Sequence, residues 1–120
     1  MPTTIKATRF VMTPETESYL QERLSALEKL IDLSDTTLKC DVELSRETGH
    51  QHGDIWRAEI NLAHKGEVVR VVADGESIHA AIDAAKDEMT SRLRRSKDKL
   101  VSTLRRSGVM LKRWLRFGRE

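Results

Sequence analysis

Alternation of apolar and polar residues dominates the middle of the chain and predicts strands. In LKCDVELSR, residues 38–46, every second residue is apolar, and IWRAEINLA, residues 55–63, follows the same pattern. VVRVVA, residues 68–73, is a third, β-branched run. Since strand side chains point alternately to two faces, the two alternating patterns indicate strands with one solvent-exposed face, and the β-branched run indicates a third strand. The turn-rich ETGHQHGD and the tight HKGE then connect three strands, the first two as a hairpin with a long loop.

The N-terminal part of the chain predicts a short strand over residues 3–10 followed by a helix. Thr13 can cap the helix and Pro14 suits its first turn. The apolar residues Leu20, Leu24, Leu27 and Ile31 then recur at spacings of four, three and four. This spacing places them on one face of a helix over residues 14–31, which we expect to pack on the core.

A second, longer helix is predicted over residues 77–106, after the turn DGES and before Gly108, a plausible C-terminal cap. A single apolar stripe runs along it: Ile78, Ile82, Ala85, Met89, Leu93, Leu100 and Leu104. About 30 residues give a helix of roughly 45 Å. Strands of about eight residues span roughly 27 Å, so several turns of this helix should extend beyond the sheet.

Length and composition indicate one α+β domain in the order βαβββα. The chain has 120 residues, 38% of them hydrophobic and 4% aromatic. We expect the domain to cover residues 1–106 and a basic amphipathic tail to cover residues 107–120. With few aromatic side chains for a deep pocket, an enzyme is disfavoured. One cysteine, no export signal and no long apolar run make a cytoplasmic protein the expectation.

Positive charge is concentrated at the C-terminal end. From Lys86 onward, 12 Lys and Arg stand against 4 Asp and Glu, a net +8, so the total of +2 leaves −6 for residues 1–85. A solvated helix face could also be basic, but solubility does not require the two signs to be segregated. The asymmetry favours nucleic-acid binding by the non-core half of the long helix.

Three segments resemble one known family. They are TPETESYLQERLSALEKLI, GDIWRAEINL and AAIDAAKDEMTSRLRRSKDKL, and their order and spacing over residues 3–101 are similar to the ribosome hibernation-promoting factors, also known as ribosome-associated inhibitor or Y-type proteins. The resemblance implies a double-stranded-RNA-binding-domain-like fold, in which a four-stranded sheet carries both helices on one face.

The resemblance also implies a function without catalysis. Members of this family bind the small ribosomal subunit and its ribosomal RNA in the channel between head and body, where they exclude mRNA and tRNA and keep idle ribosomes silent. No cofactor, metal or small-molecule substrate is expected, no membrane partner is expected, and the protein should be a monomer off the ribosome. Longer members carry a C-terminal domain that pairs two ribosomes, and these 120 residues do not contain it.

The candidate RNA-binding residues come from both arguments. Arg95, Lys97 and Lys99 match positions where the family commonly has a base, whereas Arg92 and Arg94 rest on the charge argument. The full set is Lys86, Arg92, Arg94, Arg95, Lys97, Lys99, Arg105, Arg106, Lys112 and Arg113. The chain departs from the family at Glu88 and Ser91, where relatives commonly carry Lys and Arg, and at His79, where they carry Tyr.

The tail GVMLKRWLRFGRE leaves three alternatives open. Trp114 and Phe117 could fold back on the domain, insert into a groove of RNA or ribosomal protein, or lie on an anionic membrane. The alternative to a ribosome-binding silencer is therefore a general RNA-binding or membrane-peripheral module on the same fold.

Other candidate sites have weaker support. His50 and His52 lack further ligands at a usual metal spacing. We expect His64 to be a turn residue, His79 to lie on the helix surface near the sheet, and Cys40 to be a buried, inert thiol. Asp41 and Glu43 should be ordinary solvent-side residues of a strand.

Overall fold

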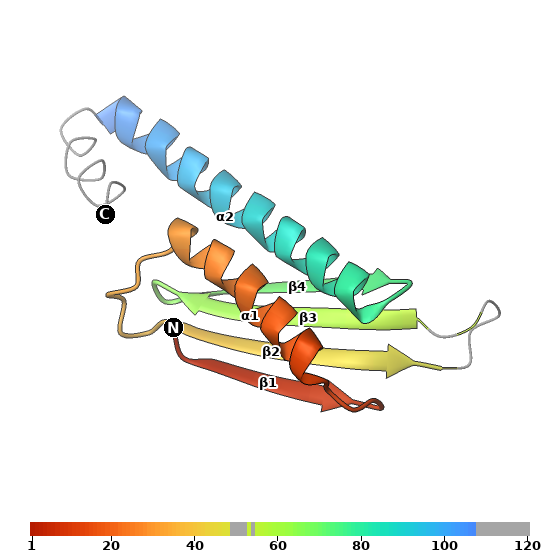
Figure 1. Ribbon diagram of the computed structural model, residues 1–120. Coiled ribbons are helices and arrows are strands. Elements are labelled where there is room, and N and C mark those ends of the chain that lie inside the picture. Colours follow the sequence, from red (N-terminus) through yellow and green to blue (C-terminus); the bar gives the residue numbers. More distant parts are fainter. Residues whose placement is uncertain (49–52, 54, 108–120) are drawn as a thin grey trace.

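The computed structural model describes residues 1–48, 53 and 55–107, with side chains as far as Ser96. Four strands and two long helices follow in the order βαβββα, which confirms the predicted fold class (Figure 1). Their bounds are β1 Thr3–Thr8, α1 Pro14–Leu27, the 3₁₀-helix η1 Glu28–Leu30, β2 Lys39–Glu47, β3 Ile55–His64, β4 Glu67–Gly75 and α2 Ile78–Ser107.

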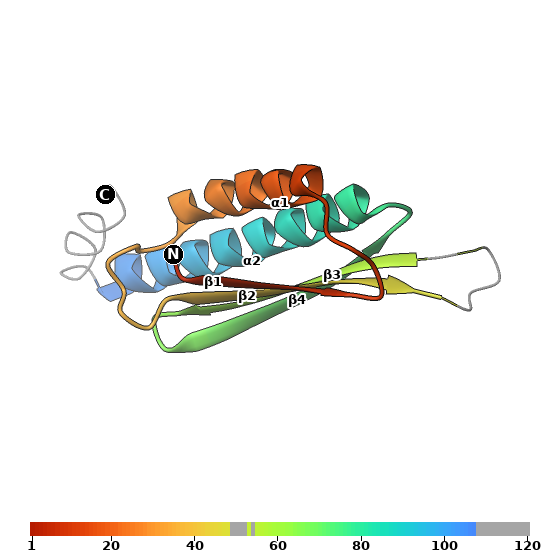
Figure 2. The same cartoon turned by 60° about the horizontal axis from the view of Figure 1, so that its bottom comes forward.

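The strands form one sheet in the order β1-β2-β3-β4. β1 runs parallel to β2, whereas the pairs β2–β3 and β3–β4 are antiparallel. Both helices lie on the same side of this sheet, as Figure 2 shows in side view. The molecule therefore has two layers, with β1 and β4 as the edge strands.

The core lies between these layers and uses the residues that the alternation predicted. Cys40, Val42 and Leu44 of β2 point toward the helices, as do Ala58, Ile60 and Leu62 of β3, and all are buried. From the described parts of the helices, the buried apolar residues are Leu20, Leu24, Leu27, Ala81, Ile82, Ala85, Met89 and Leu93. Burial of this contiguous apolar surface is the main force that holds the two layers together.

The helix α1 begins as expected and ends one turn early. Thr13 Oγ1 accepts a hydrogen bond from the backbone N–H of Thr16 at 3.1 Å, and Pro14 occupies the first turn. The prediction of a helix to Ile31 was wrong, because the chain tightens into η1 and Ile31 is already extended. A short 3₁₀ turn is a common way to satisfy the last carbonyls of a helix. Ile31 nevertheless packs against the core.

Positive φ angles at three residues explain two of the connections near the strands. β1 ends at Thr8 rather than Phe10, because Arg9 adopts a positive φ of 64° and turns the chain. Phe10 then packs edge-on against Trp56, with ring centroids 5.3 Å apart. In the hairpin between β3 and β4, Lys65 and Gly66 both have positive φ, as a two-residue turn of type I′ requires. His64, predicted to lie in this turn, is the last residue of β3.

Candidate nucleic-acid interface

The candidate interface is built on α2, whose start is fixed by close contacts with β4. Ser77 Oγ accepts a hydrogen bond from the N–H of Ala80 at 3.1 Å, which caps the helix. A Cβ on Gly75 would lie 2.6 Å from the backbone N of Ala81, so only glycine lets the strand pass this close to the helix. These contacts set the position from which the long helix extends.

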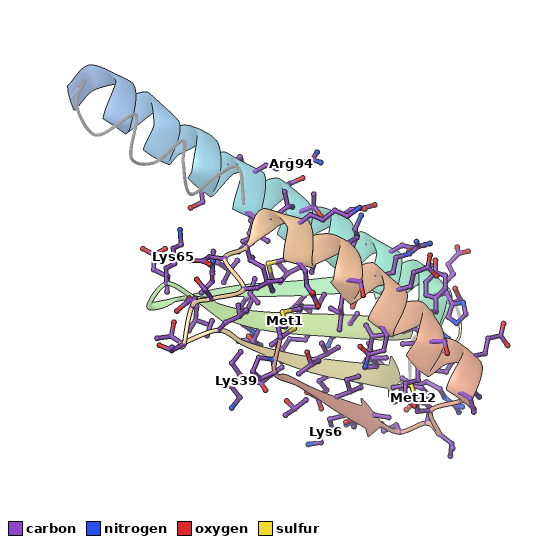
Figure 3. The ribbon with its side chains drawn as sticks, turned by 60° about the vertical axis from the view of Figure 1, so that its left-hand side comes forward. Met1, Lys6, Met12, Lys39, Lys65 and Arg94 are labelled. Atoms are coloured by element: carbon purple, nitrogen blue, oxygen red, sulfur yellow. The ribbon has the colours of Figure 1, made fainter. Side chains whose placement is uncertain are left out.

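The opposite end of α2 extends beyond the sheet. Figures 1 and 3 show the last turns of the helix continuing past the ends of the strands. Ala81, Ala85, Met89 and Leu93 pack on the sheet, and Leu93 is the last buried residue in the part of α2 whose side chains are described. The predicted overhang is therefore confirmed, and it carries the basic sequence.

Among the predicted RNA-binding residues whose side chains the structure describes, Arg94 and Arg95 are the two that are exposed without an internal partner. Both are exposed, and neither forms an ion pair or hydrogen bond with another residue whose side chain the structure describes. Figure 3 shows Arg94 pointing away from the body of the protein. They line one shallow hollow on the outer face of α2 together with Asp87, Glu88 and Ser91. Along this face the charge changes from negative to positive toward the overhang.

Two other predicted residues are engaged within the protein. Lys86 is partly buried and its Nζ lies 3.7 Å from Oδ1 of Asp87. Arg92 Nη1 donates to the carbonyl oxygen of Arg70 in β4 at 3.0 Å, and its Nη2 donates to Glu88. Arg92 is exposed but already hydrogen-bonded, so among the described side chains the basic surface without internal partners begins after it.

The remaining predicted residues are placed only in part. Lys97, Lys99, Arg105 and Arg106 belong to the helical backbone of α2, and their side chains lie outside the described atoms. Lys112 and Arg113, with the rest of residues 108–120, fall outside the described residues, as do His50 and His52. The three alternatives for the tail and the domain division at residue 106 therefore stay predictions.

The uncovered side of the sheet, which we term the open face, also contains cations, but they are paired. The open face includes Thr4, Lys6, Thr8, Lys39, Asp41, Glu43, Ser45, Glu47, Arg57, Glu59, Asn61, Val68, Arg70, Val72 and Asp74. Arg57 Nε donates to Asp74 and Arg70 Nε donates to Glu59, each at 2.8 Å. Lys6 lies 3.9 Å from Glu43. The ion pair with Asp74 raises the pKa of Arg57. Charge on this face is largely balanced across the strands.

Asp41 and Glu43 are solvent-side residues of β2, as predicted. Asp41 accepts a hydrogen bond from Thr4 of β1, and Glu43 accepts one from Thr8 at 2.8 Å. The two carboxylates therefore tie β1 to β2. Cys40 faces the core, where burial raises the pKa of its thiol to about 11. A thiol held this far from ionisation is a weak nucleophile.

Sequence reasoning missed a polar cluster between the helices. The prediction for His79 was incomplete, because its partly exposed ring also stacks on Tyr19 of α1, with centroids 4.2 Å apart and planes 5° apart. Asp83 accepts hydrogen bonds from Tyr19 Oη at 2.6 Å and from Arg23 Nε at 2.8 Å. The hydrogen bond from Tyr19, and to a smaller extent the one from Arg23, holds the pKa of Asp83 below its usual value. In the sequence, the only indication of this cluster is that Tyr19 and Arg23, and likewise His79 and Asp83, are four residues apart and so share a helix face.

His64 was also misplaced, since it links β3 to the loop after η1. Its Nε2 accepts a hydrogen bond from the backbone N–H of Asp32 at 3.0 Å. Burial, and then the charge of Lys65, lower the pKa of His64. Within the described residues, no group of three or more His, Cys, Asp or Glu is arranged to hold a metal ion. No described helix is both long and apolar enough to cross a bilayer.

The two-layer βαβββα fold with a projecting basic helix defines the chain as an α+β protein, and comparisons with known proteins specify the family. Residues 3–101 match the model of the Sigma 54 modulation protein / S30EA ribosomal protein family. The chain therefore belongs to this family, which confirms the resemblance to the hibernation-promoting factors.

Two solved structures have the same fold. The crystal structure of the N-terminal domain of Thermus thermophilus Protein Y is 27% identical, with a TM-score of 0.63, and the match covers 79% of this chain and 98% of that one. A ribosomal subunit interface protein from Coxiella burnetii is 10% identical, with a TM-score of 0.64 and coverage of 82% and 99%, and supports the fold alone. A search of curated proteins found no match.

Proposed function

We propose that this protein is a translation silencer that binds the small ribosomal subunit through α2 and occupies the channel for mRNA and tRNA. Family membership supports ribosome association. The observation that carries the finer proposal is the pair Arg94 and Arg95, exposed on a helix that extends beyond the sheet. Phosphates of ribosomal RNA are the partners that such a surface attracts. Because ribosomes are cytoplasmic, we infer that the protein acts there.

Charge distribution supports α2 rather than the open face as the RNA contact. A phosphate approaching the open face would meet arginines whose charge is already offset by carboxylates, and those carboxylates would repel it. Arg94 and Arg95 can contact phosphate without breaking an ion pair with any described side chain. Lys97, Lys99, Arg105 and Arg106 continue the same helix toward its tip and extend the proposed surface.

Mechanism in this proposal is steric exclusion. Phosphate contacts along α2 would orient the body of the protein without reading base sequence. The two-layer domain would then fill the volume that mRNA and the tRNAs need, so initiation is blocked while the protein is bound. No bond is made or broken, and release restores the subunit.

Co-sedimentation with purified small subunits at several salt concentrations tests the proposal. Arg94→Ala combined with Arg95→Ala should lower affinity at least about tenfold at low salt. It should also reduce the slope of log K against log salt by about 1.4 to 1.8, since each neutralised phosphate contributes about 0.7 to 0.9. The matched control is Lys6→Ala combined with Lys39→Ala, which removes the same charge from the opposite side of the sheet (Figure 3). Its affinity should stay within about twofold of the wild type by the same salt argument.

A competition assay separates channel occupancy from general RNA binding. Bound protein should prevent initiator tRNA from binding to the small subunit, and the double arginine variant should not. Equal affinity for unrelated duplex RNA and for small subunits, without tRNA exclusion, would support the general RNA-binding module instead. Unchanged sedimentation of the double arginine variant would remove α2 from the interface.

A further inference from the structure

Arg92 joins α2 to an edge of the sheet. Its Nη1 donates to the carbonyl oxygen of Arg70 in the edge strand β4 at 3.0 Å. Its Nη2 donates to Oε1 of Glu88, one turn earlier on the same helix, at 3.1 Å. One guanidinium group therefore contacts a strand backbone and a helix side chain at once, using one donor on each terminal nitrogen. Glu88 is the carboxylate that holds it.

This contact lies close to where α2 leaves the sheet. After Arg92, 15 residues of helix remain before its end at Ser107, or about 22 Å at the usual rise. β4 runs antiparallel to α2, and beyond Arg70 only residues 67–69 of the strand remain, about 10 Å. Leu93 is the last buried side chain within the described part of α2. Arg92 is therefore placed near the base of the overhang.

We propose that Arg92 is a positioning residue that sets the direction of the basic overhang, rather than a contact to RNA. This inference rests on the proposed function, because it assigns Arg92 a role in that same surface. A tilt of about 10° at Arg92 would move the helix end by about 4 Å over its remaining 22 Å. A shift of that size exceeds the tolerance of a hydrogen bond to phosphate. The direction of the helix therefore matters for every basic residue beyond Arg92.

Comparison with its neighbours distinguishes this role from phosphate binding. Arg94 and Arg95 are exposed, and no ion pair or hydrogen bond with a described side chain has to break when they turn toward a ligand. Arg92 would have to leave the Arg70 carbonyl and Glu88 to do the same. Loss of the Arg92 side chain should therefore alter the geometry of the whole basic surface, while the number of phosphate contacts stays nearly the same.

A distance measurement in the free protein tests the role of Arg92 without any RNA. Spin labels are attached at Val68→Cys in β4 and Ser102→Cys in α2, and the distance distribution is measured by pulsed electron paramagnetic resonance. Cys40 stays in place because its thiol is buried, and mass spectrometry verifies two labels per chain. The distribution should be narrow in the wild type and in Arg94→Ala, broad in Arg92→Ala, and intermediate in Arg92→Lys, which can reach only one partner at a time.

Binding to small subunits provides the second readout. Arg92→Ala should weaken binding about three- to tenfold, the size of effect expected from about one ordinary hydrogen bond, with the salt slope unchanged within error. Arg94→Ala, the matched control, should weaken binding and lower the slope by about 0.7 to 0.9. Circular dichroism on each variant verifies that the fold is retained.

The outcomes separate this inference from the proposed function. A broad distance distribution with an unchanged slope supports the positioning role. A narrow distribution in Arg92→Ala overturns the positioning role, and a slope reduced as much as in Arg94→Ala overturns it by making Arg92 a phosphate contact. If the Arg94→Ala and Arg95→Ala variants bind like the wild type, the proposed function fails, and the label distances still decide whether Arg92 orients the helix.

Discussion

Tyr19 of α1 donates a hydrogen bond from its hydroxyl to Oδ2 of Asp83 in α2, at 2.6 Å. Arg23 lies over the Tyr19 ring at 4.5 Å and donates to the other oxygen of the same carboxylate. The two helices are thus joined by a polar contact on top of the apolar core that both bury. Asp83 follows directly after the buried Ala81 and Ile82, so the same short segment packs on the sheet and bonds to α1.

Replacing Asp83 by Ala should destabilise the protein by about 1 kcal/mol, the usual net value of such hydrogen bonds at a partly exposed site. Urea unfolding followed by circular dichroism measures this change. Asp87→Ala is the matched control, because Asp87 lies one turn further along α2 and pairs only with Lys86 among described side chains. Its effect should stay below about 0.5 kcal/mol. Equal effects of the two substitutions would contradict a special role for Asp83.

A methyl group at Gly75 should be poorly tolerated. In Gly75→Ala the new Cβ would lie 2.6 Å from the N of Ala81 and 3.0 Å from the carbonyl carbon of Ala80, and both are backbone atoms that cannot rotate away. We expect a loss of about 2 kcal/mol or more, as for other overpacked sites. Thermal unfolding provides the measurement.

Gly66→Asn is the control for Gly75→Ala. Gly66 has a positive φ of 80° and open space around its Cα, and Asn tolerates this conformation better than other residues. Its cost should stay below about 1 kcal/mol. A Gly75→Ala variant as stable as Gly66→Asn would mean that β4 and α2 can separate locally.

Most of the fold was predicted from the alternation of apolar and polar residues along the strands, because every second residue of a strand lies on the same face. The errors arose where a single backbone angle sets the end of a strand or where a single tertiary contact sets the position of a side chain. The positive φ of Arg9 ends β1 early, and nothing in the hydrophobic pattern shows that angle. The stack of His79 on Tyr19 joins residues 60 positions apart, so it depends on how the helices pack.

Only part of the candidate site could be predicted from the sequence, because the rest depends on tertiary contacts. Helix periodicity separates core residues from outward residues, and it correctly assigned Arg94 and Arg95 to the outside. It cannot tell an outward arginine that meets only solvent from one that reaches a strand edge. Arg92 reaches the Arg70 carbonyl because α2 lies over β4, which is known only once the sheet order is known.

Cys40 should react slowly with thiol reagents in the folded protein. Its side chain is fully buried and the pKa of its thiol is raised to about 11, so about 100-fold less thiolate forms near neutral pH than for an ordinary cysteine. Ellman's reagent measures the rate before and after unfolding in guanidinium chloride. As the single cysteine of the chain, Cys40 gives an unambiguous signal. Rapid reaction in the native state would indicate that β2 opens to solvent.

Stability should depend on pH through His64. Its Nε2 accepts the N–H of Asp32, so the folded protein holds the ring neutral, and burial lowers its pKa from the ordinary 6.5. The unfolded chain then binds more protons as pH falls below about 6.5, so the stabilising effect is present above that pH and is lost toward the lower folded-state pKa. Thermal unfolding at several pH values between about 5 and 7.5 covers this window.

His64→Gln isolates this contribution, because glutamine can still accept the Asp32 N–H through its side-chain oxygen but does not titrate in this range. The variant should match the wild type near neutral pH or lose a little stability, and its unfolding temperature should fall less on acidification. His79→Gln is the matched control and removes a histidine whose partner is the Thr16 hydroxyl rather than a backbone N–H. If His64→Gln keeps the full pH dependence of the wild type, the bond to Asp32 does not require a neutral ring, and another group titrates in this window.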